Sequence, residues 1–576
     1  MTSPKREFRP ATLIDVLQWR ALHQPEQVAY SFLEDGSVES FGLTYRELDR
    51  RARAVAALLQ ASEVSGSCAL LLYPTGPEFI TAFYGCLYAG VIAVPAYPPG
   101  FNRNTRRIPA LVEDSGATVA LTTSAVLGRL EQLSTAVPQL KTVRWIATDQ
   151  IASGIEDERQ DVFINGDNIS FLQYTSGSTM SPRGVMISHS NLLYNLECCY
   201  RGWGHTPESI ALTWMPHYHD LGLVEGLMTP LYGGFRCVVM SPATMVQRPL
   251  RWMQAISRFR VTHSGGPNFA YELCVRKTTA EERAELDLSC WTVAINGAEM
   301  VRNATLKRFA DAFAVSGFRW TSNHPCYGLA EATCIVTSGV VEGAPVVCTV
   351  SAEALEQNRI EKAATGQANV RELVGVGRAV LDTKVVIVDP DSHKRCEDHE
   401  VGEIWISGPT VAQGYWNKLE ETRENFRAYL SDTGEGPFLR TGDLGFMNGN
   451  ELFITGRLKD MIIIDGRNHY PQDLELTVEQ SHPALRAGGS AAFSIELNDT
   501  EQLVVVAEVD RDVLSLQSEE VLKAVRRALS EEHEIHAHAI TLLRPDGLLK
   551  TSSGKKERHS CRNGFLQGTL EQWEVN

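Results

Sequence analysis

Hydroxyl side chains crowd around a glycine in the segment that follows residue 173. From Tyr174 to Gly184 the chain reads YTSGSTMSPRG, directly after a predicted extended stretch at 169–173. Such a loop can turn several backbone N–H groups and hydroxyls toward one anion, and Arg183 adds a charge suited to phosphate oxygens. A polar surface turn has the same composition. The sequence contains no Walker A pattern, G-x-x-x-x-G-K followed by Ser or Thr, so this is a candidate phosphate loop of another kind.

The loop resembles the phosphate-loop signature of the adenylate-forming superfamily, which contains acyl-CoA synthetases, luciferases and peptide-synthetase adenylation domains. Five more segments resemble motifs of this superfamily in its order: an adenine and magnesium segment at 327–333, a G-Y motif at 414–416, a ribose-binding motif at 440–445, a hinge at 456–460 and a catalytic-lysine loop at 550–555. The match extends from about Thr44 to Arg558. Six ordered motifs are hard to obtain by chance, so the chain is identified as a member of the superfamily.

The resemblance implies an adenylation, in which a carboxylate attacks the α-phosphorus of ATP and pyrophosphate leaves. Two anions must meet, so catalysis is mainly charge neutralisation and positioning. Glu331 is expected to ligate Mg²⁺, a cation that prefers oxygen ligands, and Lys555 to bridge the carboxylate and the α-phosphate. Taken alone, Lys555 fits an unspecialised lysine in a flexible loop. The resemblance assigns ATP or AMP binding to Thr175, Ser176, Gly177, Ser178, Thr179, Arg183, Gly297, Ala298, Tyr327, Gly328, Asp443 and Arg457.

The segment 214–223, WMPHYHDLGL, contains two histidines and an aspartate. His217 and His219 would share one face if this segment were extended, which raises the alternative of a metal site. No third histidine or cysteine is nearby in the sequence. The segment resembles the Pro-x-Tyr-His-Asp-x-Gly-Leu signature of fatty acyl-AMP ligases, and 93–99 and 467–471 resemble that branch as well. The resemblance implies a catalytic role for His219 beside the substrate carboxylate, whereas the role of Asp220 stays open.

About forty residues between Thr337 and Gly377 exceed what acyl-CoA synthetases usually carry there, and the segment at about 340–374 resembles the insertion of fatty acyl-AMP ligases. In that family the insertion is associated with failure to use CoA, although an ordinary loop insertion also costs little stability. The implied function is ATP-dependent activation of a long-chain fatty acid to an acyl-adenylate, followed by transfer to the phosphopantetheine thiol of a separate holo acyl carrier protein. The alternative is a long-chain acyl-CoA synthetase.

Two further alternatives are weaker on the residues present. An amino-acid adenylation module needs a charged partner for the substrate amine, and the corresponding loop, 263–269, offers no aspartate. A catalytically inactive adenylate-binding protein would not need Glu331, Asp443 and Lys555 together. ATP–pyrophosphate exchange separates the inactive protein from the enzymes.

Short apolar strands that alternate with helices are predicted to position these loops. A helix is expected at 44–61, with Thr44 and Glu47 at capping-box spacing, then strands at 67–73, 91–96 and 118–122. This alternation favours an α/β fold with a largely parallel sheet. The resemblance adds a β-barrel-like subdomain and a small mobile α+β domain. The expected domains are 1–456, a hinge at 457–460 with Lys459 as its pivot, and 461–576.

Composition narrows the remaining function classes. The 576 residues carry a formal charge of −16, which disfavours nucleic acid as a partner. No signal peptide or membrane-spanning stretch is predicted, and the 12 cysteines include no C-x-x-C pair, which favours reduced thiols in the cytoplasm. His533, His536 and His538 are predicted to lie on a solvated face. ATP and Mg²⁺ are the expected cofactors, and a monomer is the default expectation.

Overall fold

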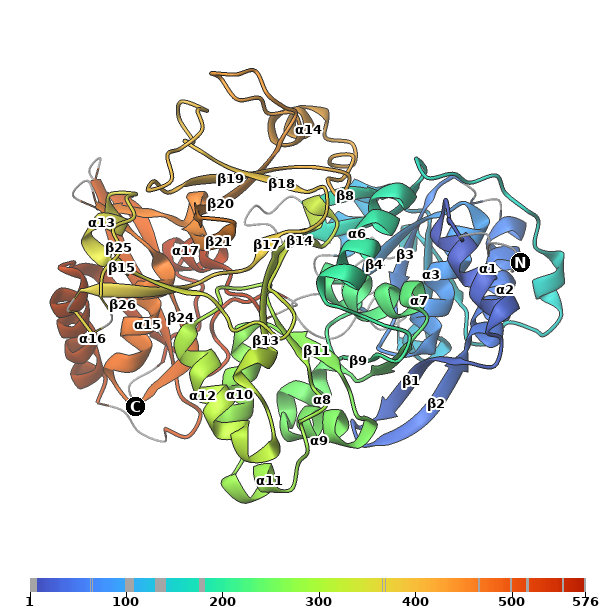
Figure 1. Cartoon of the computed structure of the whole chain (residues 1–576), viewed down its shortest axis with the longest axis horizontal. Coiled ribbons are helices and arrows are strands. Elements are labelled where there is room, and N and C mark those ends of the chain that lie inside the picture. The colour runs from blue at the N-terminus through green and yellow to red at the C-terminus, as the bar shows by residue number, and fades with distance from the viewer. Residues whose placement is uncertain are drawn as a thin grey trace, which may run out of the picture.

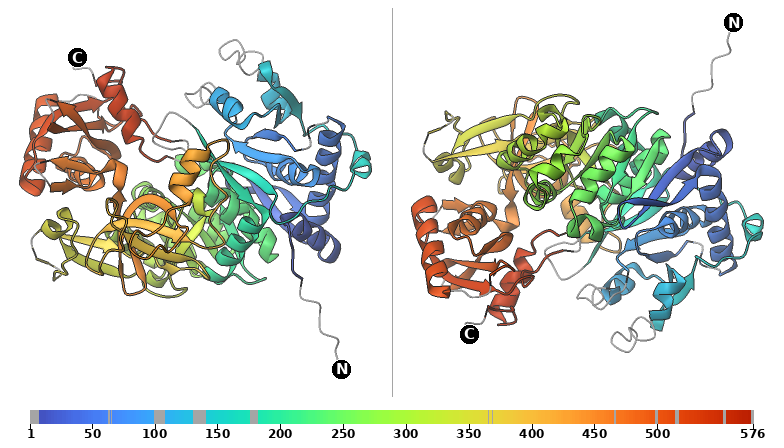
Figure 2. Two further views of the ribbon diagram at one scale, coloured as in Figure 1. Left: turned by 90° about the horizontal axis from the view of Figure 1, so that it is seen from above. Right: turned by 90° about the horizontal axis from the view of Figure 1, so that it is seen from below.

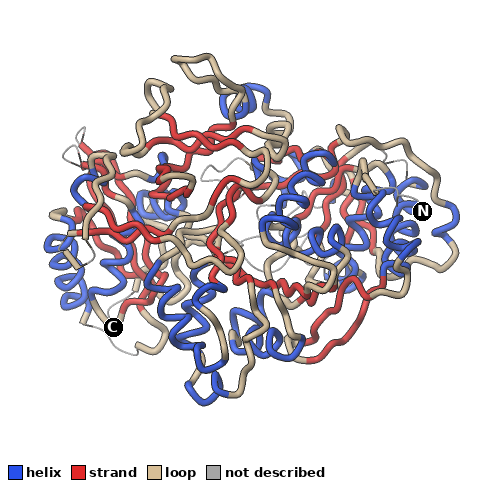
Figure 3. The backbone as a smooth tube through the Cα atoms, in the orientation of Figure 1, coloured by secondary structure: helices blue, strands red, loops and turns tan. Residues whose placement is uncertain are grey.

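The computed structural model describes residues 8–62, 64, 66–98, 108–129, 141–175, 182–364, 366–367, 369–464, 467–497, 500–513, 517–551 and 554–573. In Figure 1 the N-terminal helices and the C-terminal strands lie at opposite ends of the molecule, with the middle of the chain between them. Figure 3 shows helices and strands interleaved throughout, which confirms the expected α/β class.

A six-stranded sheet near the N-terminus has the order β6-β5-β3-β4-β7-β8. Its first five strands run parallel, and β8 returns antiparallel to β7. The predicted helix 44–61 is confirmed as α2, and the Thr44 side chain accepts a hydrogen bond from the backbone N–H of Glu47. The elements of this region are α1 (Leu13–His23), α2 (Tyr45–Ala61), β3 (Cys68–Leu72), α3 (Pro77–Ala89), β4 (Ile92–Ala96), α4 (Ile108–Ser115), β5 (Val119–Thr122), β6 (Arg144–Ala147), η3 (Ile155–Glu158), β7 (Ile169–Thr175) and β8 (Arg183–Ser188).

A nine-stranded sheet has the order β17-β14-β13-β12-β11-β9-β10-β1-β2. Its inner strands are parallel, and both edges are antiparallel. Ligands of such sheets bind beyond the carboxyl ends of the parallel strands. The strands are β1 (Val28–Glu34), β2 (Val38–Thr44), β9 (Ile210–Thr213), β10 (Arg236–Val239), β11 (His263–Gly266), β12 (Val293–Asn296), β13 (Asn323–Gly328), β14 (Ile335–Ser338) and β17 (Arg378–Ala379).

The helices that connect these strands include a π-helix, η4 (Leu221–Met228), which begins directly after Asp220. The others are α6 (His189–Gly202), α7 (Thr229–Gly233), α8 (Pro242–Gln247), α9 (Leu250–Phe259), α10 (Asn268–Lys277), α11 (Ala280–Ala284), α12 (Asn303–Phe313), η5 (Ala314–Ser316), η6 (Trp320–Ser322) and η7 (Ala330–Ala332).

The segment predicted to be an insertion folds into a two-stranded antiparallel ribbon, β15 (Val347–Ser351) and β16 (Val370–Val374), with a short helix, α13 (Ala352–Glu356), between the strands. It packs beside a four-stranded antiparallel sheet of β18 (Lys384–Val388), β19 (Gly402–Ser407), β20 (Leu439–Asn448) and β21 (Glu451–Arg457), and α14 (Leu419–Phe426) connects β19 to β20. A shared apolar cluster joins the ribbon to this sheet and to Tyr470 further along the chain.

Strand β21 ends at Arg457, and a single 3-10 turn, η8 (Leu458–Asp460), follows. The segment after residue 460, here called the C-terminal lobe, forms its own sheets and apolar clusters. Figure 2 shows this orange and red lobe beside the rest of the molecule in both views. Its elements are β22 (Ile462–Ile464), β23 (Arg467–His469), α15 (Pro471–Ser481), β24 (Leu485–Leu497), β25 (Thr500–Val509), α16 (Ser518–His533), β26 (Ala537–Leu543) and α17 (Arg558–Leu566).

The histidine cluster of the C-terminal lobe differs from the prediction. His536 and His538 are exposed as predicted, but His533 is only 5% exposed. Its Nε2 lies 2.8 Å from the hydroxyl of Thr477. The reason is helix length: α16 continues to residue 533, and residues 521, 525, 529 and 533 recur at intervals of four on its buried face.

None of the helices in the described part of the chain is long and apolar enough to cross a membrane.

Candidate active site

A cleft of about 2440 Å³ lies where the N-terminal sheets meet the C-terminal lobe. Most residues predicted to form the site line this cleft: Thr175, Arg183, His219, Ala298, Tyr327, Gly328, Glu331, Asp443, Arg457, Lys459 and Lys555. Gly297 does not line it and is buried behind Ala298, where a Cβ would come within 2.8 Å of Cys326 Sγ. Ser176, Gly177, Ser178 and Thr179 lie outside the described residues.

Asp443 occupies the centre of the predicted ribose site. It lies opposite Arg457 in the register of β20 and β21. Its Oδ1 accepts a hydrogen bond from Arg457 Nε at 2.8 Å, and its Oδ2 accepts one from the Tyr327 hydroxyl at 2.7 Å. The charge of Asp443 raises the pKa of Arg457. Tyr327 and Arg457, from two other motifs, therefore converge on the carboxylate of Asp443, whose oxygens can accept hydrogen bonds from hydroxyl groups.

Glu403, on β19, holds the segment that carries Asp443, and the sequence motifs do not include it. It is 2% exposed. Its Oε1 accepts from the N–H of Gly442 at 3.0 Å, and its Oε2 accepts from Arg440 Nε at 3.0 Å. Gly442 has a φ of +70°, a conformation that glycine adopts without strain. The signal for Glu403 is a charged residue within the apolar run 402–407, GEIWIS.

Glu331 approaches the cleft from η7, and the Tyr415 hydroxyl donates to its Oε1 at 2.9 Å. Burial raises the pKa of Glu331, although the hydrogen bond from Tyr415 and the charge of Arg457 act in the opposite direction. A hard oxygen donor in a cleft that also contains the candidate phosphate-loop residues Thr175 and Arg183 fits Mg²⁺, which takes few protein ligands and completes its shell with phosphates and water. The described residues include no cluster of three His, Cys, Asp or Glu side chains that could hold a metal ion by themselves.

Arg183 lies beside the same tyrosine. Its guanidinium is 5.3 Å from the centre of the Tyr415 ring and pairs with Glu421 at 2.7 Å. Because both ions are partly exposed, this pair is weak in water. An incoming phosphate therefore competes readily for Arg183.

The histidine pair of segment 214–223 does not form the shared face of an extended strand. The chain turns at 217–218, so His217 packs into the core against Phe79, with ring centres 3.9 Å apart. His219 instead lines the cleft, and its Nδ1 lies 2.6 Å from Asp220 Oδ1. Burial works against ionisation of Asp220, but His219 and Lys555 outweigh it and lower the pKa of this carboxyl.

Lys555 reaches the cleft from the C-terminal lobe. Desolvation lowers its pKa, and Asp220, Glu299 and Asp443 act in the opposite direction. These three carboxylates belong to the N-terminal part, so the lobe holds the ammonium group of Lys555 among the residues of the cleft. The neighbouring Lys556 instead pairs within its own lobe, with Glu475 at 3.0 Å and Glu479 at 2.9 Å.

One wall of the cleft is apolar. It includes Leu221, Cys326, Cys334, Ile335 and Trp203, next to the carboxylate-binding candidates His219 and Lys555. His324 is a packed histidine, which is buried and contacts Ser338 Oγ at 2.8 Å without lining the cleft. The arrangement offers a nucleotide site and an apolar site that meet at a lysine and a histidine.

Comparisons with known proteins agree with this geometry. The model of the AMP-binding enzyme family matches residues 17–416, and a model described as "Disco-interacting protein 2-like, AMP domain" matches residues 459–575. The chain is 49% identical to the medium-chain-fatty-acid–acyl-carrier-protein ligase JamA of Moorena producens, over 99% of this chain and 97% of that protein. It is 35% identical to the long-chain-fatty-acid–AMP ligase FadD26 of Mycobacterium bovis, over 97% and 98%.

Solved structures give the same result. A crystal structure of fatty acid AMP ligase from Legionella pneumophila is 38% identical with a TM-score of 0.78 and covers 100% of both chains. A fatty acyl-adenylate ligase of the same organism, in complex with acyl adenylate and pyrophosphate, is 38% identical with a TM-score of 0.76 and covers 98% of both chains.

The chain therefore belongs to the AMP-binding, adenylate-forming enzyme family. Within that family it is a member of the fatty acyl-AMP ligases, which confirms the branch that the sequence motifs predict.

Proposed function

We propose that this protein joins a fatty acid to AMP at the expense of ATP and then passes the acyl group to a carrier-protein thiol. In the first step a fatty-acid carboxylate oxygen attacks the α-phosphorus and pyrophosphate leaves. In the second step the thiol sulfur attacks the acyl carbon, AMP leaves with the bonding electrons, and the thiol proton passes to solvent. The observation that carries this proposal is the meeting of Lys555, His219 and the Asp443 site in one cleft with an apolar wall.

We assign a role to each of the predicted site residues. Asp443 accepts from the ribose hydroxyls, with Arg457 as a further donor, and Tyr327 and Gly328 border the adenine. Thr175 and Arg183, with the loop residues Ser176 to Thr179, bind the β- and γ-phosphates. Glu331 ligates Mg²⁺, which neutralises phosphate charge when bound. His219 orients the substrate carboxylate, and Lys555 neutralises charge between that carboxylate and the α-phosphate.

The choice of acceptor rests on the insertion and on the relatives. JamA and a second relative, from Teredinibacter turnerae, are named acyl-carrier-protein ligases. In this chain the insertion contacts the C-terminal lobe directly: Arg467 Nε lies 2.8 Å from Glu356, and Arg371 Nε lies 3.4 Å from Asp473. These contacts tie the insertion to the lobe that carries Lys555. The names of the two relatives support an acyl carrier protein rather than CoA as the acceptor, and we propose a separate holo carrier protein.

We further propose the division into residues 1–456 and 461–576, with residues 457–460 as hinge and Lys459 as pivot. Lys459 is exposed in a single turn between β21 and β22, where few contacts oppose a change of backbone angles. After adenylation the lobe turns about this point, and Lys555 leaves the cleft. A monomer contains every residue that the two steps use.

The test is to incubate the protein with ATP, Mg²⁺ and fatty acids of graded length, with CoA, with holo carrier protein or with neither, and to identify products by mass spectrometry. Acyl-AMP that persists with CoA and is consumed by the carrier is the expected result. It also reports whether the prediction of a long-chain substrate holds, since JamA is named for medium-chain acids. Rapid formation of acyl-CoA would contradict the proposed acceptor, and absence of acyl-AMP would contradict the proposed function.

A further inference from the structure

Lys555 lies in the turn of a short hairpin. Lys550 and Lys556 pair as an antiparallel bridge, and the N–H of Glu557 donates to the carbonyl of Leu549 at 2.9 Å. Within the turn, the N–H of Lys555 donates to the Thr551 hydroxyl at 3.0 Å. The hairpin is therefore anchored at its base, but these backbone bonds alone do not fix its direction relative to the cleft.

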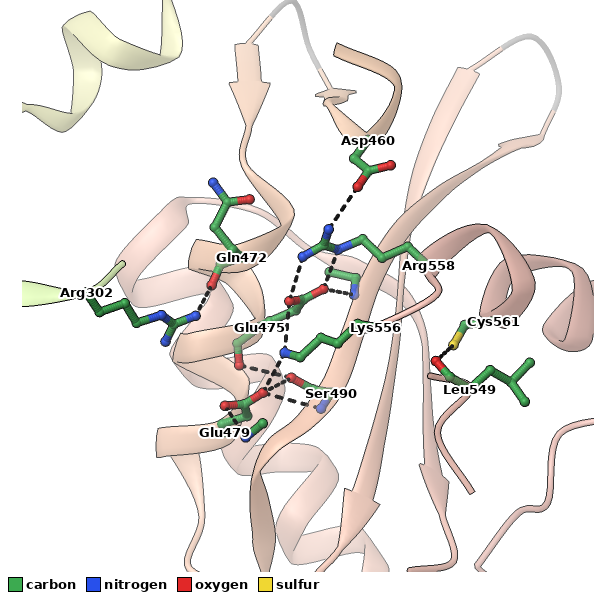
Figure 4. Close-up of polar contacts among 12 residues, drawn as sticks. Arg302, Asp460, Gln472, Glu475, Glu479, Ser490, Leu549, Lys556, Arg558 and Cys561 are labelled. Atoms are coloured by element: carbon green, nitrogen blue, oxygen red, sulfur yellow. Dashed lines mark hydrogen bonds and ion pairs between the residues drawn. The ribbon is translucent and has the colours of Figure 1, made fainter. Parts of the chain in front are cut away.

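A buried carboxylate on α15 holds one arm of this hairpin. Glu475 is 1% exposed and binds Arg558 through two bonds, from Nε at 2.7 Å and from Nη2 at 3.0 Å. The same carboxylate accepts from Lys556 Nζ at 3.0 Å. Figure 4 shows Glu475 between these two cations, with the side chains of Lys556 and Arg558 directed toward α15. A fork of this type fixes geometry as well as charge.

Glu475 binds close neighbours of Lys555. Lys556 and Arg558, which follow Lys555 closely in the sequence, are both held against α15. Lys555 itself lines the cleft, where Asp220 acts on its ammonium group. The attraction of Arg558 and Lys556 outweighs burial and lowers the pKa of Glu475 to about 2. The anchor therefore stays ionised at neutral pH.

Arg558 also contacts the last residue of the proposed hinge. Its Nη1 donates to Asp460 Oδ2 at 2.8 Å, on the side of the guanidinium away from Glu475 (Figure 4). Asp460 follows Lys459 directly in the turn between β21 and β22. One guanidinium thus joins α15, the hairpin and the proposed hinge.

We propose that Glu475 is a positioning residue for adenylation, which acts through Arg558 and Lys556 to hold Lys555 in the cleft at a fixed distance from the hinge. This inference rests on the proposed function, because it assigns no contact with substrate to Glu475. It predicts that the effect of Glu475 on catalysis depends entirely on Lys555.

A double-mutant cycle on acyl-AMP formation tests this dependence. Glu475→Gln keeps the shape of the side chain and removes its charge, and it should lower the single-turnover rate of adenylation about 100-fold, the scale of a misplacement of about 1 Å. The KM for ATP should change less than about twofold, since the nucleotide sites lie in the N-terminal part. In a Lys555→Ala background the same substitution should change the remaining rate less than about twofold, because the group that it positions is gone.

Two further measurements separate positioning from loss of fold. Glu475→Gln should still transfer the acyl group of a synthetic acyl-adenylate to holo carrier protein at the wild-type rate, since that step does not use Lys555. Glu479→Gln is the matched control, one helical turn further on α15. It removes a charge that contacts Lys556 but not Arg558, so its adenylation rate should fall less than that of Glu475→Gln.

The outcomes distinguish this inference from the proposed function. If the wild-type protein makes no acyl-AMP, the proposed function is wrong. The inference is wrong if the wild type is active but Glu475→Gln lowers the adenylation rate by the same factor with and without Lys555. It is also wrong if Glu479→Gln lowers that rate as much as Glu475→Gln, because Glu475 is then a structural residue. If Glu475→Gln does not fold, Arg558→Lys decides in the same cycle, because it keeps the charge but breaks the two-bond fork.

Discussion

Replacement of Lys555 by alanine should abolish most of the adenylation activity. The ammonium group lies within the influence of Asp220 and Arg457 in a partly desolvated cleft. A unit charge about 4 Å from a developing phosphate charge, at an effective dielectric constant of about 20, contributes about 4 kcal/mol. Since about 1.4 kcal/mol corresponds to a tenfold change in rate, the expected loss is about 1000-fold in kcat for acyl-AMP formation.

Acyl-AMP formation is measured by ATP–pyrophosphate exchange and by mass spectrometry of single turnovers. Lys523→Ala is the control, because Lys523 lies exposed on α16 and pairs only loosely with Glu519, at 3.7 Å. Transfer from synthetic acyl-adenylate to the carrier should survive in Lys555→Ala. A loss of less than about tenfold in adenylation, or an equal loss in both steps, would refute the assignment of Lys555 to the first step.

Three other predictions concern the nucleotide, the acceptor and the stability of the core. Asp443→Asn should raise the KM for ATP at least tenfold in the exchange assay, because a charge-assisted hydrogen bond contributes about 1.5–3 kcal/mol; an unchanged KM would place the ribose elsewhere. Arg467→Ala should raise acyl-CoA formation about fivefold over the matched variant Arg527→Ala, because a partly exposed ion pair, here with Glu356, contributes about 1 kcal/mol; equal acyl-CoA yields would remove this contact from acceptor selection. Burial raises the pKa of Glu225 to about 8, above the unfolded value of about 4.3. The neutral carboxyl therefore makes its full contribution to the free energy of unfolding below the unfolded pKa, and this contribution is lost as the pH rises toward 8. Glu225→Gln should therefore raise the melting temperature at pH 7–8 but not at pH 4, and the opposite trend in thermal denaturation would show that the carboxylate is ionised in the fold.

Local features of the fold were predictable because they depend on neighbours in the sequence. The cap of α2 by Thr44 and the alternation of strands with helices both follow from short-range chemistry. The burial of His533 at the end of α16 was not predicted, because a histidine after a run of polar residues gives no apolar signal. His533 is buried only because Thr477 and Arg371 satisfy its ring nitrogens, and neither partner is visible from the sequence around it.

The residues of the site divide in the same way, into those that local sequence marks and those that it does not. Glu331, Asp443 and Lys555 occur in short motifs whose glycine and hydroxyl neighbours mark them, and the structure brings them to one cleft. Glu475 has no such neighbours, and Glu403 is marked only as a charge within an apolar run. Their arginine partners, Arg440 and Arg558, are 37 and 83 positions away, so only the folded chain reveals that these carboxylates are paired. Supporting residues of a site are harder to predict than its reactive groups for this reason.

Two sets of contacts hold the C-terminal lobe, and they restrain different parts of it. The insertion contacts Arg467 on β23 and Asp473 on α15. Glu475 and Arg558 instead hold the lysine hairpin within the lobe. On the proposed mechanism, a change in the first set should alter how freely the lobe turns as a body and so the acceptor step. A change in the second set should misdirect Lys555 and so alter adenylation. Because α15 takes part in both, with Asp473 and Glu475 only two residues apart, substitutions on this helix should separate the two steps of the reaction more cleanly than substitutions in the cleft itself.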